Sequence, residues 1–389
     1  MSSYNQLNRR EFVKILSATG AGFALAPYMP KFSFAKTFSS TKPKTNIEDA
    51  LKYPRNENSM PGLYPGKVIQ AIDEKSVVDN QFNQKVIDDM VEKAMLKLTG
   101  RDNISEAWNT FVKPGEIIGL KLNPVAGKEL STSLEIVRSI IKQLETAGIS
   151  KQNIVIWDRR EFELHEVGFT EENFPGIKIT GTERKDKAGS FYNKDGVLYS
   201  EEMIDKDWYY RAECEDKYDE ETLPYMVNEG EYSYFTKIIT KDVDKIINVP
   251  ILKNAGASVT ICMKNLAYGS ITNTGRLHKE LWSETSAEVC AFPPLRDKVV
   301  LNIVDGIKGC FDGGPGANPQ FIMNFNTILA GTDPVAVDRV GYEIILKERL
   351  ERKVQEKESP RGRKFMELAQ DLQLGVADIE KIEWEKVVL

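Results

Sequence analysis

Charged side chains recur where five apolar stretches of this 389-residue sequence end. A loop with a purely structural task more often uses Ser, Gly or Asn at such points. If the stretches are strands of an open parallel sheet, their carboxyl ends form the edge at which such sheets bind ligands. The recurrence therefore predicts a site built from Lys121-Leu122-Asn123-Pro124, Asp158-Arg159-Arg160, Lys253-Asn254, Asp305-Gly306 and Gly331-Thr332-Asp333.

One chemistry open to these residues is metal binding. The carboxylates of Asp158, Asp305, Asp333 and Asp338 would supply the hard oxygen ligands that Mg²⁺ and Ca²⁺ prefer. Adding His278 would favour Mn, Fe or Zn instead. The predicted metal ligands are Asp333, Asp338 and His278. Structural alternatives stay open, because Asp333 can cap a helix, Asp158 can pair with an arginine, and a lone histidine is more often a structural residue than a ligand.

The other chemistry is anion binding. Lys121, Lys253 and Lys264, together with backbone N–H groups of the run Gly313-Gly314-Pro315-Gly316, would cradle a negative charge. The glycine run matches neither the P-loop nor the dinucleotide fingerprint, so nucleotide binding has little support. A tight turn that needs positive φ explains the same glycines equally well.

The few histidines and cysteines limit the kinds of metal site and catalytic site that the chain can form. With only His165 and His278, the chain offers no all-histidine metal site, no H-E-x-x-H motif and no Ser–His–Asp triad that can be assembled. The four cysteines contain no C-x-x-C, so the pattern does not support an iron–sulfur cluster or a zinc ribbon. We expect most of them to be buried small apolar residues, although a disulfide is open to an exported chain. They are Cys214, Cys262, Cys290 and Cys310.

The elements that would position these residues are clearest in one strand–helix–strand unit. Residues 115–122 (GEIIGLKL) are predicted to be a buried strand, and residues 153–157 (NIVIW) a second one. Between them, apolar residues at helical spacing over 134–144 predict an amphipathic helix that Ser131 or Thr132 would cap. A unit of this kind predicts parallel pairing of its two strands.

The rest of the chain extends this pattern. The last predicted strand leads into Asp333 and Pro334, which suit the N-cap and the first position of a helix. The predicted fold class is α/β, with a mainly parallel sheet flanked by helices. Residues 181–242, which are acidic and dense in Tyr and Trp, interrupt the pattern and are predicted to be an insertion, either a β-rich lobe or a solvated excursion. The further predicted strands are 67–72, 245–252, 299–304 and 326–330, and a further helix is predicted over 80–98.

The N-terminus has the build of a signal peptide. Arg9 and Arg10 precede a mild apolar run and then small residues, an order that resembles the twin-arginine export signal. We predict export to the periplasm by the twin-arginine machinery, with cleavage after Ala35, because Ser33 and Ala35 place small residues at both required positions. An uncleaved membrane tether and an amphipathic helix of the fold are the alternatives. The predicted parts are a signal peptide (1–35), a linker or irregular arm (36–66) and an α/β domain (67–389).

Composition excludes some partners. A hydrophobic content of 41% and a charged content of 28% are typical of a chain with a real core. The net charge of -6 and the lack of a long basic run argue against nucleic acid as a partner. No window of about twenty apolar residues follows the signal, so no transmembrane span is predicted in the mature chain.

Three segments of the chain resemble the domain of unknown function 362 family: VPILKNAGASVTICMKNLAYGSI, IVDGIKGCFDGGPGANP and LAGTDPVAVDRV. Upstream, GLKLNP and VIWDRREFELHEVGF fit the same pattern, so the resemblance covers about residues 67–345 in the expected order. The family implies little settled activity, and the ferredoxin module that some relatives carry has no matching cysteine cluster here. His278, in TNTGRLHK, resembles a position found in exported relatives. The other matching polar positions are Lys121, Asn123, Asp158, Arg159, Lys253, Lys264, Asn265, Asp305, Asp333 and Asp338.

These residues lead to two predicted functions. The first is an exported enzyme that acts on a small anionic molecule at the carboxyl ends of the strands, with or without a bound divalent metal. The second is a non-catalytic binding protein or an accessory subunit of an exported redox complex, for which the aromatic-rich insertion would be the interface. The predicted catalytic residues are Lys121, Asp158, Lys253 and Asp305, and the predicted ligand-binding residues are Asn123, Arg159, Lys264, Asn265, Gly313 and Gly314.

Overall fold

The computed structural model describes residues 42–214, 225–256, 258–354 and 361–389. The predicted signal peptide and its cleavage point after Ala35 lie outside these ranges. Within the predicted arm, the short helix α2 (Ile47–Leu51) and the buried Met60 contribute to a hydrophobic core of the domain. No helix within the described ranges combines the length and the apolar character needed to cross a membrane.

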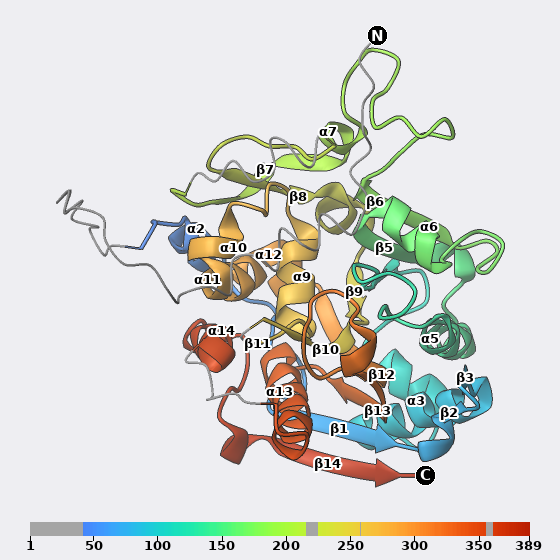
Figure 1. The fold of residues 1–389 in the computed structure, drawn as a ribbon. Helices are drawn as coiled ribbons and strands as arrows, with labels where there is room; N and C mark the ends of the chain where they lie inside the picture. The colour runs from blue at the N-terminus through green and yellow to red at the C-terminus, as the bar shows by residue number, and fades with distance from the viewer. Residues whose placement is uncertain (1–41, 215–224, 257, 355–360) are drawn as a thin grey trace, which may run out of the picture. The chain divides into compact units, whose positions relative to one another are not determined.

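A ten-stranded sheet forms the centre of the fold (Figure 1). The strands follow the order β14-β1-β13-β12-β9-β4-β5-β6, and β10 and β11 extend from β12. Six pairs are parallel, namely β14–β1, β12–β9, β9–β4, β4–β5, β5–β6 and β10–β12, so the predicted α/β class with a mainly parallel sheet is confirmed. The bounds are β1 (Lys67–Ile72), β4 (Ile118–Lys121), β5 (Ile154–Arg160), β6 (Lys178–Glu183), β9 (Lys245–Asn248), β10 (Ile251–Ala255), β11 (Ser258–Val259), β12 (Val299–Cys310), β13 (Ile322–Gly331) and β14 (Glu383–Val388).

Two strands differ from the sequence-based expectation. Residues 245–252 form parts of two strands rather than one, because Pro250 has no N–H to donate to a ladder. The strand β13 pairs antiparallel with both β1 and β12, and Gly331 at its carboxyl end lies opposite Asn302. The strand β13 therefore runs in the opposite direction to β4, β5, β9 and β12, and Gly331 at its carboxyl end lies level with Asn302 and Asn248.

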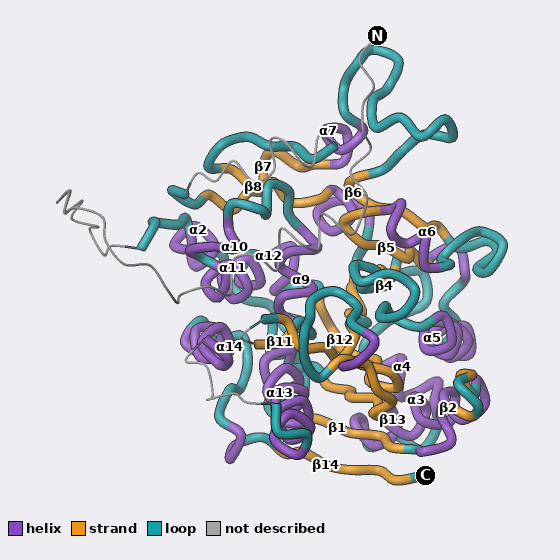
Figure 2. The backbone as a smooth tube through the Cα atoms, viewed as in Figure 1, coloured by secondary structure: helices purple, strands orange, loops and turns teal. Residues whose placement is uncertain are grey.

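Helices cover both faces of this sheet, as Figure 2 shows. On one face, α3 (Gln84–Thr99), α4 (Ile104–Asn109) and α5 (Leu134–Thr146) pack on one another, and α3 also packs on β1 and β13. On the other face, α9 (Cys262–Ser270) and α13 (Pro334–Glu351) contact each other, and α11 (Trp282–Glu288) and α14 (Arg361–Asp371) join them. Each face has its own hydrophobic core. The remaining α-helices described are α6 (Glu161–Val167), α7 (Tyr199–Met203), α10 (Leu277–Glu280) and α12 (Pro293–Arg296).

The helix caps show how local sequence sets the ends of these elements. Asp333 caps α13 as predicted, since its Oδ1 accepts hydrogen bonds from the backbone N–H groups of Val335 and Ala336. The cap of α5 is Ser133, so the prediction of Ser131 or Thr132 is wrong. Thr132 cannot cap because its hydroxyl accepts from the Asn123 N–H and donates to the Val249 carbonyl oxygen.

The predicted aromatic-rich insertion begins within β6, to which residues 181–183 still belong. Within it, β7 (Ile204–Arg211) and β8 (Tyr232–Thr236) form a separate two-stranded antiparallel sheet, seen at the top of Figure 1 above α9 and α10. The buried Arg276 holds this sheet to the domain. Its guanidinium donates to the carbonyl oxygens of Ala212 and Glu231 and to the Ser233 hydroxyl, each at 2.8 Å.

Candidate functional site

Lys121 and Asp158 form a closed ion pair at the carboxyl ends of β4 and β5. The fully buried Lys121 ammonium donates to the Asp158 carboxylate, to the Leu122 carbonyl oxygen (2.8 Å) and to the Asn265 amide oxygen (3.1 Å). All three of its N–H groups are therefore used. Burial lowers the pKa of Lys121, and the adjacent Asp158 carboxylate opposes this shift. The structure thus brings together two of the four predicted catalytic residues.

Gly269 of α9 leaves the space for this ammonium. A Cβ atom at position 269 would lie 2.5 Å from Lys121 Nζ, closer than a carbon atom can approach. The helix can therefore pack over the end of β4 only because this position has no side chain. The sequence reasoning missed Gly269, since nothing in the sequence marks which glycine of a helix faces a lysine from a distant strand.

A chain of buried amides runs from the ion pair into the sheet. Asn265 Oδ1 also accepts from Asn123 Nδ2 (3.0 Å), and Asn265 Nδ2 donates to Asn248 Oδ1 (2.9 Å). Asn248 Nδ2 in turn donates to Asn302 Oδ1 (2.9 Å). The chain ends where Asn302 Nδ2 meets two backbone carbonyl oxygens at and just after the end of β13, each at 3.3 Å. These linked amides hold α9 against the sheet in one arrangement.

Lys253 adds a buried ammonium to this network. Its side chain is 1% exposed, and Nζ donates to Asn123 Oδ1 at 2.9 Å. No carboxylate in the described ranges lies at ion-pair distance from it. Burial lowers the pKa of Lys253 to about 8, although the attraction of the Glu163 carboxylate opposes the shift. An amine with this pKa is partly neutral near physiological pH and can serve as a general base, a nucleophile or a cation.

Lys264 is a second perturbed amine near Lys253. Its half-buried side chain places Nζ 5.5 Å from the centre of the Tyr268 ring and 5.4 Å from the centre of the Trp282 ring. Across the part of the chain that the structure describes, no oxygen accepts a hydrogen bond from it. Burial, together with repulsion from Lys253, lowers the pKa of Lys264 to about 7. Contacts with two aromatic rings offset only part of the cost of that burial.

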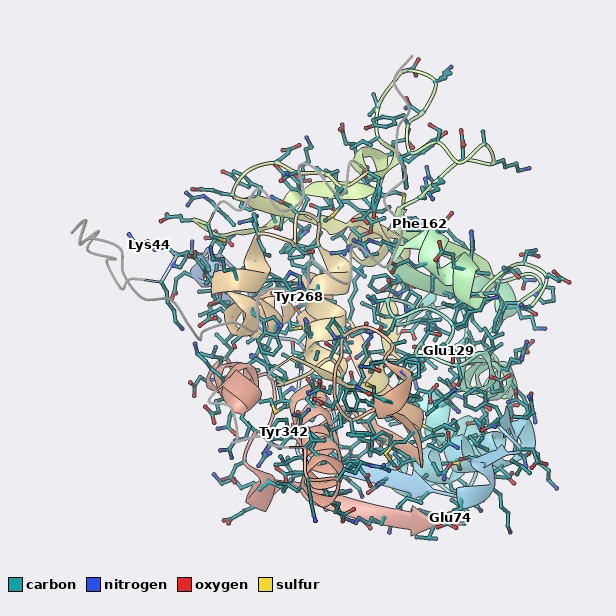
Figure 3. All side chains as sticks on the ribbon, in the orientation of Figure 1. Lys44, Glu74, Glu129, Phe162, Tyr268 and Tyr342 are labelled. Atoms are coloured by element: carbon teal, nitrogen blue, oxygen red, sulfur yellow. The ribbon has the colours of Figure 1, made fainter. Side chains whose placement is uncertain are left out.

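Arg159 and His278 border the same tyrosine, Tyr268, which Figure 3 labels beside α9 and α10. Arg159 Nη1 donates to the Tyr268 carbonyl oxygen (3.3 Å) and to the Thr274 hydroxyl, and the His278 ring centre lies 4.5 Å from that of Tyr268. His278 Nδ1 lies 3.0 Å from the Thr274 carbonyl oxygen, which can only accept, so Nδ1 carries the proton and Nε2 is the acceptor. Limited hydration beside Tyr268 and the positive charges of Lys264 and Arg159 lower the pKa of His278. Arg159, Lys264 and His278 therefore form one basic cluster.

Asp305 is used to support α5. Its Oδ2 accepts from the Ser133 N–H (2.8 Å) and hydroxyl (2.6 Å), and its Oδ1 accepts from the Ile307 N–H (3.1 Å). Burial raises the pKa of Asp305 to about 6, and the hydrogen bonds from Ser133 oppose that rise. Its described contacts are with α5 and its own strand rather than with Lys121 or Lys253.

The Asp333 carboxylate makes none of its described hydrogen bonds with Lys121 or Asp158. Asp333 lies just beyond the carboxyl end of β13, which runs antiparallel to β12 rather than parallel as the strand-end prediction assumed, and its part in the site stays a prediction. Its Oδ2 accepts from the N–H groups of Gly66 (3.0 Å) and Val376 (2.9 Å), in addition to capping α13. Burial raises the pKa of Asp333 to about 6 against these hydrogen bonds.

Asp338 has a comparable role at the start of α9. Its carboxylate accepts from the N–H groups of Cys262 (2.5 Å) and Met263 (3.0 Å), and burial raises its pKa to about 7. His278 lies with Tyr268 instead, so the structure does not bring the three predicted metal ligands together. Within the described ranges, no group of three or more His, Cys, Asp or Glu side chains is arranged to hold a metal ion.

The glycine run at 313–316 packs against the end of β10. Gly313 has a φ of +68°, in agreement with the tight-turn interpretation. A Cβ at Gly314 would collide with the Asn254 carbonyl oxygen, and the Gly314 carbonyl oxygen accepts from the Gly256 N–H at 3.3 Å. Close packing thus accounts for these two glycines, and their predicted role in ligand binding stays a prediction.

The four cysteines are all buried, as expected for most of them, and no disulfide joins them. Burial raises the pKa of the Cys262, Cys290 and Cys310 thiols. Thiols in such surroundings stay protonated and unreactive at neutral pH.

The sequence reasoning missed a second ion network beside the pair. Arg160 donates to Glu183 Oε2 and to Glu163 Oε1, both at 3.0 Å, and joins β5, β6 and α6. Burial raises the pKa of Glu163, and the charge of Arg160 opposes the rise. The missed amides Asn248 and Asn302 had a usable signal, because each interrupts an otherwise apolar strand sequence.

A family model described as a domain of unknown function (DUF362) matches residues 118–343. The chain belongs to this family. The match spans every predicted site residue from Lys121 to Asp338, so the site described above lies within the family's domain. Membership of an exported branch stays a prediction.

No curated protein matches the chain. Among solved structures, it is similar to the crystal structure of a protein from Thermotoga maritima, with 8% sequence identity and a TM-score of 0.37. The similarity covers 68% of this chain and 59% of that one, so the chain spans less than two thirds of that protein's length.

Proposed function

We propose that this chain is an enzyme that binds a small anionic molecule at the edge of the sheet where β4, β5 and β10 end. The observation that supports this most is the pair of amines of Lys253 and Lys264, which lie near each other and have no carboxylate partner among the described residues. Positive charge at this edge comes from lysines, so the proposal does not depend on a metal.

A purely structural role explains this pair of amines poorly. An ammonium group that leaves water without a counter-ion costs several kcal/mol. Apolar side chains of similar volume would fill the same space at a lower cost. Strongly perturbed amines of this kind occur preferentially at functional sites. An anion held between Lys253 and Lys264 would supply the missing counter-charge.

Within this proposal, the predicted site residues divide into two roles. Lys253 and Lys264 would contact the anion, and Lys253 is the catalytic candidate among the four residues predicted to be catalytic. Lys121 and Asp158 use their polar atoms on each other and on Asn265, so we assign them as positioning residues. We assign Asp305 as a positioning residue too, because its carboxylate holds Ser133 at the start of α5.

Thermal unfolding of the mature chain in the presence of inorganic phosphate, sulfate and acetate tests the binding step. We expect an anion-dependent rise in Tm in the wild type and none in Lys253→Met. The matched control is Lys298→Met, which removes a partly buried lysine that donates to the carbonyl oxygens of Ile239 (2.8 Å) and Val243 (2.7 Å). This control should keep the anion response. An equal rise in Tm in wild type and Lys253→Met would contradict the proposed site.

A second candidate function rests on the insertion. Tyr232 is 37% exposed, and its ring centre lies 5.3 Å from that of Tyr209 and 6.0 Å from that of Tyr234 on the β7–β8 sheet. Because aromatic residues are enriched at protein interfaces, this cluster favours a binding protein or an accessory subunit of an exported redox complex. Tyr232→Ser should then abolish capture of a partner in native mass spectrometry without changing the phosphate response. Recovery of the wild type as a lone monomer would count against this candidate.

We also propose export to the periplasm, supported by Arg9, Arg10 and the apolar run that follows them. Fractionation and intact mass measurement should find a periplasmic chain that begins at Lys36. The double variant Arg9→Lys, Arg10→Lys should remain in the cytoplasm. A full-length chain in the membrane fraction would support the tether alternative instead.

A further inference from the structure

We propose that Lys264 forms an imine with the carbonyl carbon of a small oxo acid, and that Arg159 pairs with the acid group of the same molecule. This inference rests on the proposed anion site and deepens it by naming the class of substrate. It concerns the basic cluster of Arg159, Lys264 and His278 beside Tyr268.

Lys264 is more accessible than Lys121 or Lys253 at this edge. Lys121 is fully buried with three hydrogen-bond acceptors, and Lys253 is 1% exposed and bonded to Asn123. Lys264 is half-buried, and its Nζ faces two aromatic rings and contacts no hydrogen-bond acceptor in the described part of the chain. A reactive amine needs this combination of access and an uncommitted nitrogen lone pair.

The surroundings of Lys264 keep a large fraction of its amine neutral. Burial and the charge of Lys253 hold its pKa at about 7, so the nucleophilic form is abundant at neutral pH. In the imine-forming step, Nζ attacks the carbonyl carbon and the C=O bond breaks. The carbonyl oxygen leaves as water with the two hydrogens of the amine, and a C=N bond replaces the C=O bond. No oxidant or reductant is needed.

The remaining groups of the cluster suit an acid group and a further hydrogen bond to the same molecule. Arg159 Nη1 is held by the Tyr268 carbonyl oxygen and the Thr274 hydroxyl, whereas Nη2 donates to no atom in the described ranges. His278 offers Nε2 as a hydrogen-bond acceptor because its Nδ1 proton is committed to Thr274.

Two carboxylates beside this cluster have cationic partners. Glu183 pairs with Arg160 at 3.0 Å and with Arg159 Nε at 3.5 Å, and Glu284 pairs with Lys364 at 2.9 Å. The cluster therefore keeps an excess of positive charge, which favours a carbonyl compound that carries its own negative charge over a neutral one.

Reductive trapping tests the inference. The mature protein is incubated with glyoxylate or pyruvate in the presence of sodium cyanoborohydride. In parallel, it is incubated with acetaldehyde or acetone, which are neutral probes of similar size. Intact mass and peptide mapping should place one reduced adduct on Lys264. The oxo acids should react at least about tenfold faster than the neutral probes, as expected for one charge-assisted contact. Lys264→Arg should lose the adduct, and Lys347→Arg, which changes an exposed lysine, should keep it.

Several results would overturn the inference. They are the absence of an adduct, adducts spread over exposed lysines, or equal labelling of wild type and Lys264→Arg. Equal labelling rates for the oxo acids and the neutral probes would show that Arg159 does not pair with the acid group. If Arg159 does pair with it, Arg159→Gln should lower the labelling rate of the oxo acids to that of the neutral probes. If Lys264→Arg does not fold, the peptide map of the wild type still decides the site of attachment. A phosphate response that depends on Lys253, without any trapping on Lys264, would leave the proposed anion site intact and reject imine formation alone.

Discussion

Replacing Lys253 with methionine should stabilise the protein at neutral pH. Lys253 is buried and has a single hydrogen bond, to Asn123. Burial lowers its pKa from 10.5 to about 8 in the folded protein, whereas the unfolded chain keeps the ordinary value. Below pH 8 the lysine is charged in both states, and the folded state carries the full cost of the buried charge. Because one pKa unit corresponds to about 1.4 kcal/mol, this cost is about 3 kcal/mol.

The same shift fixes how stability changes with pH. Between about pH 8 and 10.5 the unfolded lysine still binds a proton that the folded lysine has released. The free energy of unfolding therefore rises with pH in this window, by about 1.4 kcal/mol per pH unit, and the rise is complete above the unfolded pKa. Methionine carries no charge, so Lys253→Met lacks this rise. The variant also leaves Asn123 Oδ1 without its donor, at a cost of about 1–2 kcal/mol, so the net gain at pH 7 is about 1–2 kcal/mol.

Urea unfolding followed by tryptophan fluorescence from pH 7 to 10.5 measures both quantities. The difference in unfolding free energy between wild type and Lys253→Met should shrink and then reverse in sign as the pH rises. Lys347→Met, at a side chain that is 74% exposed, should follow the wild type throughout. A difference that stays constant with pH would refute the reasoning, because it would mean that no buried charge is lost with Lys253.

Three further predictions follow from individual contacts. Gly269→Ala should destabilise the protein by about 1–3 kcal/mol in urea unfolding and abolish the phosphate response, because its Cβ would displace Lys121. Gly316→Ala, whose Cβ meets no atom within 4 Å, should change neither the stability nor the phosphate response. Equal effects of Gly269→Ala and Gly316→Ala would contradict this role of Gly269. For Asp305, burial raises the folded pKa from 3.8 to about 6, so between these pH values the folded state holds a proton that the unfolded state has lost. The free energy of unfolding should therefore fall as the pH rises from 3.8 to about 6 in the wild type, but not in Asp305→Asn. Equal dependence of the urea midpoint on pH in the two proteins would argue against this role of Asp305. Arg276→Met should speed thermolysin cleavage within residues 204–236 by about tenfold or more, since it loses hydrogen bonds to both strands of the insertion, and an unchanged cleavage rate would show that Arg276 does not hold it.

The pairing of Lys121 with Asp158 could be predicted in outline from the sequence. A strand, an amphipathic helix and a second strand form a crossover unit, and such a unit places the two strands parallel. Lys121 ends the first strand and Asp158 lies near the end of the second, so their side chains reach the same edge of the sheet. The details of the contact, including the part of Gly269, depend on how α9 packs, and no local pattern states this.

Asp333 shows where reasoning from strand ends fails. The apolar run before it fits a strand of either direction, and the prediction assumed the parallel one. The connection from Cys310 to Ile322 has no crossover α-helix among its described residues, and a connection this short and rich in glycine is typical of an antiparallel pair. That signal was present in the sequence. The sequence signal for the amide chain from Asn265 to Asn302 was weaker. A buried asparagine can be noticed within an apolar run, but its hydrogen-bond partner comes from another part of the chain and is not marked in the sequence.

The amide network explains how the fold can hold two repelling amines in place. Asn123 fixes Lys253 and is itself fixed by Asn265, whose helix also carries Lys264. The folded state therefore bears the cost of the buried charges before any ligand arrives, and an anion between the lysines would recover part of that cost as binding energy. Groups held ready in this way need little rearrangement when charge enters the site. The expected gain in stability of Lys253→Met and its expected loss of anion binding are then two consequences of one arrangement, as in other sites where function is maintained at the expense of stability.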